Sequence, residues 1–236
     1  MIDMGKKRDD AIKRLDREKL HSPVEALDLV KATATAGFDE TVEAAFNLGI
    51  DARQADQAVR GTISLPHGTG KSVRVLVFAE GDQARAAQEA GAYVVGGNEL
   101  AAAVESGAQP ADWDVTIAAP SMMAAVGKLG RVLGPRGLMP NPKAGTVTED
   151  IGKAVNEFRT GRVEYRNDKF GNVHVPIGKV SFDADQLRAN LAAAIDELMR
   201  VKPASAKGRY IRKLAVASTM GPGVKVDVGA LDTLDE

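Results

Sequence analysis

Residues 65–79 read LPHGTGKSVRVLVFA, and the character of the chain changes within them. The first part, up to Lys71, is rich in glycine and proline, which is typical of a crossing between two parts of a protein. The second part, residues 73–79, is short and mostly apolar, which predicts a buried strand. This stretch therefore separates two regions that we expect to fold differently.

After this stretch, and up to about residue 160, short apolar strands alternate with helices. The expected strands cover 73–79, 93–95 and 113–118, and the expected helices follow near 82–90, 98–104, 121–129 and 150–158. Such alternation is the pattern of a parallel, three-layer α/β unit. Because no Gly-x-Gly-x-x-Gly follows the first strand, its likeness to dinucleotide-binding folds concerns the fold alone.

The two ends of the chain mix helices with alternating strands. Ser22 followed by Pro23 predicts the start of a helix over 23–35. In residues 41–48 every second side chain is apolar, which predicts a strand buried on one face. The other expected elements are a charged surface helix over 9–19, strands at 61–65 and 210–216, a hairpin of 163–166 with 172–175, and a helix within 181–201.

We therefore predict an α+β domain that is split in sequence, with a three-layer α/β (Rossmann-like) domain inserted into it. The split domain comprises residues 1–68 plus 161–236, and the inserted domain comprises residues 69–160. Two adjacent crossings, near 66–70 and 159–161, can act as a hinge. The residues assigned to this hinge are His67, Gly68, Gly70 and Gly161.

The composition narrows the class of protein. The 236 residues include no cysteine, which excludes disulfides and thiolate metal sites and favours a reducing cytosol. The chain lacks an apolar run of about eighteen residues, and its first part is mostly charged, so we expect neither a membrane span nor a secretory signal. Because the formal net charge is only −1, a nucleic-acid partner can be inferred only from local clusters of charge.

Residues 68–72, GTGKS, suggest an alternative function, that of a nucleotide-dependent enzyme. The full phosphate-binding motif needs a further glycine at position 65, where this chain has leucine, and a helix directly after the loop. A buried strand is expected there instead. The sequence therefore argues against this alternative, which would require the protein to bind a nucleotide.

No set of residues forms a recognisable catalytic or metal site. His21, His67 and His174 are isolated in sequence, without the spacing of metal ligands. Ser121 does not stand in a Gly-x-Ser-x-Gly motif. We expect no enzymatic activity, no metal and no cofactor.

Basic residues gather in two segments. Between Leu198 and Val226 the chain has seven lysines and arginines and no acid, and the Gly-Pro-Gly turn of residues 217–223 lies within this segment. Such a turn either approaches a phosphate closely or simply links two strands. Residues 127–143 form a long Gly/Pro loop with four basic residues, which is either a partner contact or a structural Ω-loop.

Polar and basic loops of the split domain can together contact structured RNA. Thr219 can bond a 2′-hydroxyl, and Gly221 permits close backbone approach. Met220 and Phe38 can pack on a sugar or a base, although an aromatic residue in such a loop is more often a plug for the core. The cations that can meet phosphates are Lys169, Lys213 and Arg53.

Several motifs in order along the chain closely resemble the L-one family of large-subunit ribosomal proteins, bacterial type. The resemblance extends from about residue 5 to residue 228, and the combination is far more specific than any single motif. The motifs are FDETVE at 38–43, RGT at 60–62, LPHGTGK at 65–71, GPRGLMP at 134–140, RNDK at 166–169 and TMGP at 219–222.

This resemblance implies that the split domain binds large-subunit ribosomal RNA at the mobile stalk beside the tRNA exit site. It also implies a role in the release of deacylated tRNA, and translational repression through a similar RNA fold in the protein's own mRNA. The protein is then expected in the cytoplasm, on the ribosome, and as a monomer when free.

The resemblance also implies which residues contact RNA. In that family the surface includes the positions of Phe38, Thr41, Glu43, Asp168, Lys169, Thr219, Met220 and Gly221. On the strand before the last loop some members have serine where this chain has Lys213, so we expect a phosphate contact there. The loop 130–143 belongs to the inserted domain, whose RNA contacts are secondary.

Overall fold

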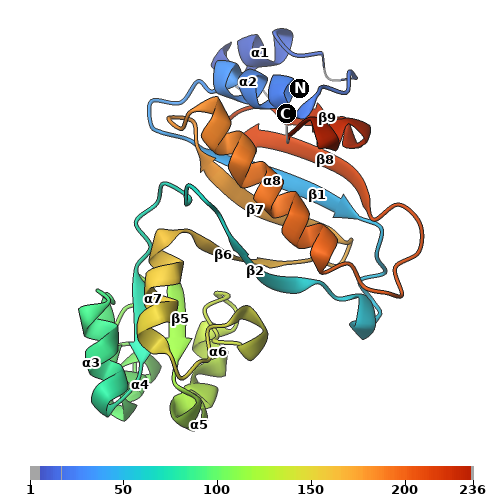
Figure 1. The fold of residues 1–236 in the computed structure, drawn as a ribbon. Helices are drawn as coiled ribbons and strands as arrows, with labels where there is room; N and C mark the ends of the chain where they lie inside the picture. Colours follow the sequence, from blue (N-terminus) through green and yellow to red (C-terminus); the bar gives the residue numbers. More distant parts are fainter. Residues whose placement is uncertain (1–5, 17, 235–236) are drawn as a thin grey trace. The chain divides into compact units, whose positions relative to one another are not determined.

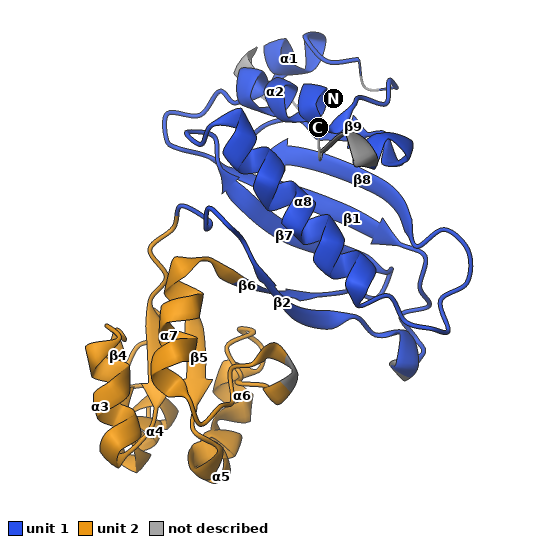
Figure 2. Cartoon of the chain, viewed as in Figure 1, with its two compact units in different colours: residues 1–70, 163–236 blue, residues 71–162 orange. Residues whose placement is uncertain are grey.

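The computed structural model describes residues 6–16 and 18–234. The chain divides into two compact units, coloured separately in Figure 2: unit 1 comprises residues 1–70 and 163–236, and unit 2 comprises residues 71–162. Each unit has a hydrophobic core of its own. The chain therefore leaves unit 1 after Gly70 and returns to it at Val163.

Unit 1 is built on a four-stranded antiparallel sheet (Figure 1). Its strands are, in spatial order, β7 (Asn172–Lys179), β1 (Thr41–Leu48), β8 (Ile211–Ser218) and β9 (Val224–Val226). A separate sheet of two strands pairs β2 (Arg60–Ser64) with β6 (Arg162–Arg166). Because β1 is paired on both sides, it is a central strand of the larger sheet.

Helices cover one face of the larger sheet. Helices α2 (Pro23–Thr33) and α8 (Ala184–Arg200) pack on it, and α8 lies over the sheet in Figure 1. The alternating apolar side chains of β1 are all buried on this side, as the sequence predicts. Unit 1 also contains α1 (Lys6–Lys13) and the 3₁₀ helices η1 (Ala55–Gln57) and η5 (Val228–Leu234).

Local sequence signals set the starts of the two covering helices. The Ser22 hydroxyl accepts a hydrogen bond from the backbone N–H of Glu25 (3.3 Å), and Pro23 is the first residue of α2. Asp183 caps α8, and its backbone N–H donates to the side chain of Gln186 (3.1 Å), which completes a capping box. These short-range patterns fix how both helices begin and therefore how they enter the core.

Unit 2 is built on a parallel sheet. Strand β3 lies between β4 and β5, and all of the pairs are parallel. The strands are β3 (Val75–Phe78), β4 (Val94–Gly96) and β5 (Val115–Ala118). The helices are α3 (Gly81–Glu89), α4 (Asn98–Glu105), α5 (Met123–Val126), α6 (Gly130–Leu133) and α7 (Ile151–Thr160), with 3₁₀ helices η2 (Pro120–Met122), η3 (Gly127–Leu129) and η4 (Pro142–Ala144). The chain thus has mixed α and β content, with antiparallel and parallel sheets.

A buried asparagine fixes the last part of unit 1 before the chain enters unit 2. Asn190, on α8, is fully buried. Its carbonyl oxygen accepts from the backbone N–H of His67 (3.0 Å), and its amide donates to the carbonyl oxygens of Gly68 (2.9 Å) and Ile177 (2.8 Å). Asn190 thereby holds residues 67 and 68 on α8. Gly70, which follows them, has a positive φ of 69°.

The bounds expected for the first helix, residues 9–19, are wrong. Helix α1 begins at Lys6 and ends at Lys13. Beyond it, the Asp16 carboxylate accepts a hydrogen bond from the backbone N–H of Glu18 (3.0 Å). An aspartate that binds a backbone group two residues ahead competes with helical hydrogen bonding, so the helix stops before it.

The hairpin expected for residues 163–166 and 172–175 is also wrong. Strand β6 pairs with β2, whereas β7 pairs with β1 in the other sheet. Asn167, at the end of β6, donates its backbone N–H to the carbonyl oxygen of Val59 (3.0 Å) and accepts from the Val59 N–H through its side chain (2.8 Å). These long-range bonds direct β6 toward β2 and away from its neighbour in sequence.

The segment 127–143 is not a loop without secondary structure. It contains η3 and α6, and Leu129 and Leu133 are buried in the core of unit 2. Glycines are frequent in this segment, but the two leucines anchor its first half. Of the two interpretations, this anchoring favours a structural role for that half. Across the described part of the chain, no helix combines the length and apolarity needed to cross a membrane.

Candidate nucleic-acid interface

The face of the larger sheet that is opposite to α2 and α8 is exposed, and we call it the open face. Strand register places the alternate residues of β1, β7 and β8 on it. Its middle consists of the small side chains Ala45, Ala215 and Ala217, which are partly exposed. The open face comprises Thr41, Glu43, Ala45, Asn47, Asn172, His174, Pro176, Lys213, Ala215, Ala217 and Lys225.

Two loops meet at one end of the open face, and we call residues 36–41 and 218–221 the loop end. The backbone N–H of Thr41 donates to the Thr219 hydroxyl (3.0 Å), which in turn donates to the Thr41 carbonyl oxygen (3.3 Å). The Thr41 hydroxyl accepts from Nζ of Lys179 (2.9 Å). The structure therefore brings Thr41 and Thr219 together: the Thr219 hydroxyl joins the loop to β1, and the Thr41 hydroxyl joins β1 to Lys179 of β7.

A buried carboxylate holds the loop end in place. Glu40 is only 1% exposed. One of its oxygens accepts from the backbone N–H of Met220 (2.8 Å), and the other accepts from the backbone N–H of Ala36 (2.9 Å). Burial alone would raise the pKa of Glu40, but these backbone hydrogen bonds outweigh it and the pKa lies below its ordinary value.

Phe38 and Met220 both face solvent at the loop end. Each side chain is 58% exposed, which is unusual for large apolar residues. Of the two interpretations of Phe38, the core plug is therefore wrong. Gly221 has a structural reason to be glycine, because a Cβ there would collide with Oγ of Ser218.

The turn between β6 and β7 lies at the other end of the open face, which we call the tip end (residues 47–53, 167–171 and 209–213). The Asp168 carboxylate accepts from the backbone N–H groups of Asn172 and Phe170 (both 2.8 Å) and from the Asn172 amide (3.0 Å). The backbone hydrogen bond from Asn172 is the main cause of a lowered Asp168 pKa. Asp168 thus shapes the turn that exposes its neighbours.

The same turn presents a cation and an aromatic ring. Phe170 is 70% exposed, and Nζ of Lys169 lies 5.0 Å from the centre of its ring. A cation at this distance from an aromatic face is attracted to it. Lys213 is exposed and lies opposite Asn47 in the register of β8 and β1, while Arg53 is exposed in the loop after β1.

The expected RNA-binding residues therefore fall into two groups. Phe38, Thr41, Glu43 and the loop 219–221 belong to the loop end or lie beside it, whereas Arg53, Asp168, Lys169 and Lys213 belong to the tip end. The stretch of β1 between Thr41 and Asn47 spans about 20 Å. A ligand that contacts both groups must extend along the whole sheet.

Three residues at these ends are absent from the expected site. Glu40 and Lys179 hold the loop end together, and Phe170 is exposed at the tip end. Glu40 lies inside a motif that the sequence singles out, and Phe170 directly follows another, but only the folded structure shows that Glu40 is buried and Phe170 is exposed. No signal in the sequence points to Lys179.

The segment 68–72 has no features of a nucleotide site. It is followed by β3, and Nζ of Lys71 forms an ion pair with Asp114 (2.6 Å). The Asp114 carboxylate also accepts from the backbone N–H of Arg74 (3.0 Å). Within the residues that the structure describes, His, Asp and Glu side chains form no group of three suited to a metal ion.

Comparison with known proteins identifies the class. The model of the ribosomal protein L1p/L10e family matches residues 30–222. The protein named large ribosomal subunit protein uL1 of Streptomyces avermitilis is 58% identical over 214 residues, which is 91% of this chain and 88% of the relative. The proteins of the same name from Streptomyces virginiae and Kitasatospora aureofaciens are 58% and 57% identical over the same shares of both chains.

These relatives are ribosomal proteins and not enzymes, so the expectation of a non-enzymatic protein is confirmed. The chain belongs to the ribosomal protein L1p/L10e family. The resemblance inferred from its motifs is thereby confirmed as well, and the match covers all of the open face except Lys225.

The Glu40→Gln variant tests how the loop end is held. Glu40 uses both carboxylate oxygens, whereas an amide has a single acceptor oxygen, so the bond to Ala36 or to Met220 must be lost. We expect the free energy of unfolding to fall by about 1–3 kcal/mol. Chemical denaturation measures this change, and NMR shifts of the two amide protons show which bond is lost.

The same contact predicts a dependence on pH. Because the pKa of Glu40 is lowered by folding, its stabilising effect is present at neutral pH and is lost as the pH falls below 4.5, through the lowered value. The Met220 amide shift of the wild-type protein should therefore change over this acidic range. A Met220 amide that titrates equally in the Glu40→Gln variant would contradict the assignment to Glu40.

Proposed function

We propose that this protein is a component of the large ribosomal subunit and binds ribosomal RNA through the open face of unit 1. The name of its relatives places them in that subunit, and membership of the family implies binding to the subunit's RNA. The observation that carries the proposal is the open face itself. It combines small side chains in the middle with polar, cationic and exposed apolar groups at both ends.

Each part of the open face has a role in this proposal. The alanines allow the RNA backbone to approach the strands closely, and Thr41, Glu43 and Thr219 offer partners for 2′-hydroxyls. The cations of the tip end meet phosphates, which position the RNA. Exposed apolar side chains provide surfaces for sugars and bases. The cations are Arg53, Lys169 and Lys213, and the apolar side chains are Phe38, Phe170 and Met220.

Asp168 and Gly221 act on the RNA indirectly in this proposal. The Asp168 carboxylate is occupied by the turn, so its contribution is to present Lys169 and Phe170. Gly221 lets the loop pack on Ser218 and so places Met220. Their replacement should therefore change the shape of the surface more than its chemistry.

We further propose a split RNA-binding domain with an inserted α/β domain, connected by a hinge that includes Gly68, Gly70 and Gly161. All of these glycines have positive φ, which other residues rarely adopt. Asn190 holds His67 and Gly68 on α8, so the bending would be concentrated at Gly70 and Gly161. Equal scattering profiles of the protein portion, free and RNA-bound, would contradict the hinge.

By family resemblance, we also propose that the RNA site is the mobile stalk, that the protein aids release of tRNA from the exit site, and that it represses translation of its own mRNA. One surface serves both RNAs in this proposal. The two should therefore compete: an mRNA leader that fails to displace the ribosomal RNA would contradict repression through the open face.

Excision of unit 2 tests where the RNA binds. Residues 1–70 joined to 163–236 retain the whole core of unit 1 and the whole open face. We expect this shortened chain to bind large-subunit RNA within about tenfold of the full-length affinity, a difference of about 1.4 kcal/mol. Filter binding against competitor RNA measures both affinity and specificity.

The control is unit 2 alone, residues 71–162, which has its own core and should bind weakly and without specificity. Specific binding by unit 2, together with its loss from a folded unit 1, would move the main site away from the open face. Circular dichroism of each fragment establishes whether it is folded.

A further inference from the structure

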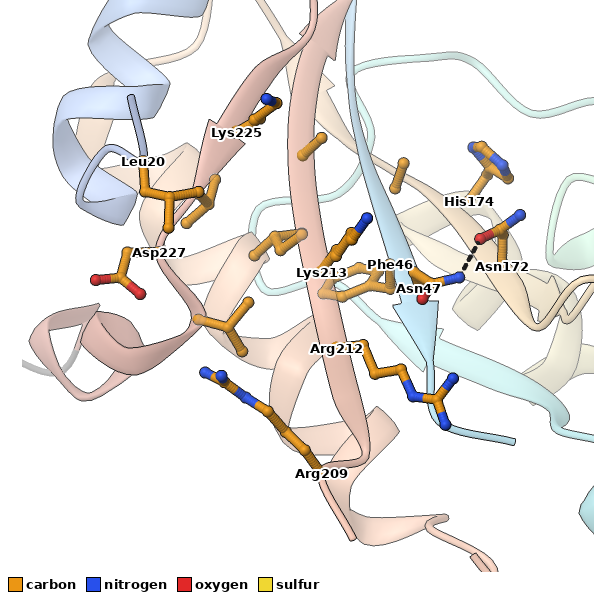
Figure 3. Close-up of a pocket in the computed structure, with 15 residues that line it drawn as sticks. Leu20, Phe46, Asn47, Asn172, His174, Arg209, Arg212, Lys213, Lys225 and Asp227 are labelled. Atoms are coloured by element: carbon orange, nitrogen blue, oxygen red, sulfur yellow. Dashed lines mark hydrogen bonds between the residues drawn. The ribbon is translucent and has the colours of Figure 1, made fainter. Parts of the chain in front are cut away.

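A hollow of about 590 Å³ opens on the open face, at the tip end (Figure 3). This volume lies within the range of about 300–1,000 Å³ that is usual for sites of small organic groups. Strands β1, β7, β8 and β9 all contribute to its wall. The residues that decide its chemistry are Leu20, Arg209, Arg212, Lys213, Lys225 and Val228.

A β-bulge places two consecutive cations at this hollow. Lys213 lies opposite Asn47, but Ile211 already lies opposite Leu48, so Arg212 is an extra residue in β8. Both Arg212 and Lys213 are exposed and line the hollow, although neighbours in a regular strand point to opposite faces. Bulges of this kind redirect side chains and are frequent beside functional sites.

The charge of the hollow is strongly positive. Its lining contains four lysines and arginines and a single acid, Asp227. One Asp227 oxygen already accepts from the backbone N–H of Gly229 (2.8 Å). Among the described residues, Arg209, Arg212 and Lys213 form no ion pair with a carboxylate, whereas Lys225 lies 3.4 Å from the exposed Glu18.

The other side of the hollow is apolar. Leu20 is 56% exposed at its rim, and Val228 also lines the hollow. An exposed leucine beside a group of uncompensated cations fits a ligand that has a flat apolar part and a negative charge. A nucleotide has both, because its base has an apolar face and its phosphate is anionic.

We propose that this hollow binds one unpaired nucleotide of the RNA, with its base against Leu20 and Val228 and its phosphate on Arg212 and Lys213. Arg209 meets the adjacent phosphate of the same strand. The inference rests on the proposed RNA-binding function and extends it. It adds a second anchoring point, distinct from the loop end, and assigns it to residues 20, 209, 212 and 228.

Salt dependence provides the test, with full-length protein and purified large-subunit ribosomal RNA. The logarithm of the association constant falls linearly with the logarithm of salt concentration. In the Arg209→Gln/Arg212→Gln variant we expect this fall to be less steep by about 1.4, since each phosphate contact with single-stranded RNA contributes about 0.7. Affinity at moderate salt should fall about tenfold or more. Arg212→Lys should keep the wild-type slope, because it keeps the charge.

Two further variants complete the test. Arg188→Gln, on helix α8 at the covered face, removes an arginine without affecting the hollow and should leave slope and affinity unchanged. Leu20→Ser should weaken binding with an unchanged slope, because it alters only the contact with the base. The affected side chains at 20, 209 and 212 are exposed, so all variants should fold, which thermal unfolding verifies.

If the double variant keeps the wild-type slope and affinity while the wild-type protein binds RNA, the nucleotide site in the hollow is overturned and the proposed function is not. The same result would leave the loop end as the site, which Thr219→Ala tests separately. Absence of RNA binding by the wild-type protein would overturn the proposed function and this inference together.

Discussion

The Met220→Asp variant is expected to bind large-subunit RNA about 100-fold more weakly than the wild-type protein, a loss of about 2.7 kcal/mol. The substitution removes an exposed apolar contact and adds a carboxylate at the loop end, on the face that is proposed to meet RNA. Stability should hardly change. The Met220 side chain is outside the core, and its backbone N–H can still donate to Glu40.

Met199→Asp is the matched control for this variant. Met199 is 50% exposed, and it lies on α8, which covers the opposite face of the sheet. It undergoes the same chemical change within unit 1, so it should reproduce any general effect of added negative charge. Affinity should remain near that of the wild type. Equal losses in both variants would show that charge alone, and not the loop end, explains the result.

Thr219→Ala addresses the same loop by a different mechanism. The Thr219 hydroxyl both accepts from and donates to the backbone of Thr41, so its removal loses two of the hydrogen bonds that hold the loop on β1. We expect about tenfold weaker RNA binding, since about 1.4 kcal/mol is typical of such contacts. Thr219→Ser keeps the hydroxyl and should bind nearly as the wild type. Wild-type affinity in Thr219→Ala and Met220→Asp together would contradict the site.

The Asn190→Leu variant is expected to lose about 3 kcal/mol of stability in unit 1. Leucine has nearly the shape of asparagine, so little cavity forms, but the buried carbonyl oxygens of Gly68 and Ile177 and the partly buried N–H of His67 lose their partner. An unsatisfied buried polar group costs about 1–3 kcal/mol. Asn156→Leu is the control, because Asn156 is an exposed asparagine within a helix, and it should change stability by less than about 0.5 kcal/mol.

Two optical signals separate the units in this experiment. The single tryptophan, Trp113, is buried in unit 2, so its fluorescence during urea unfolding reports on that unit. Circular dichroism reports on both units. Asn190→Leu should shift only a transition that fluorescence does not detect. A shifted fluorescence transition, or no shift at all, would contradict the proposed role of Asn190.

Local patterns were sufficient to predict much of the fold. The alternation in 41–48 gives the bounds of β1 and the side that is buried, because a strand repeats every two residues. Ser22 and Pro23 give the start of α2, because they satisfy or avoid the unpaired N–H groups of a first helical turn. In these elements the physical cause lies within a few residues of its effect.

Predictions failed where the cause is distant in sequence. The turn at 167–171 has the local appearance of a hairpin, but Asn167 binds Val59 and sends β6 to another sheet. The bulge at Arg212 exists only in relation to the register of β1. A sequence does not contain these relations in any one place. The basic segment 198–226 is visible in the sequence, but the meeting of its cations at one hollow is not.

The candidate site shows the same division. The exposed residues of the loop end, such as Met220, stand in motifs that the family resemblance identifies. Their support does not: Glu40 resembles any other acid of a charged loop until folding buries it between Ala36 and Met220. Residues that contact a ligand were thus easier to predict than residues that position them.

A hydroxyl-radical footprint on large-subunit ribosomal RNA tests the central claim most directly. The wild-type protein should protect one structured region of the RNA. Met220→Asp should lose this protection, and Met199→Asp should retain it. A footprint that is absent from the wild type, or unchanged in Met220→Asp, would contradict RNA binding by the open face.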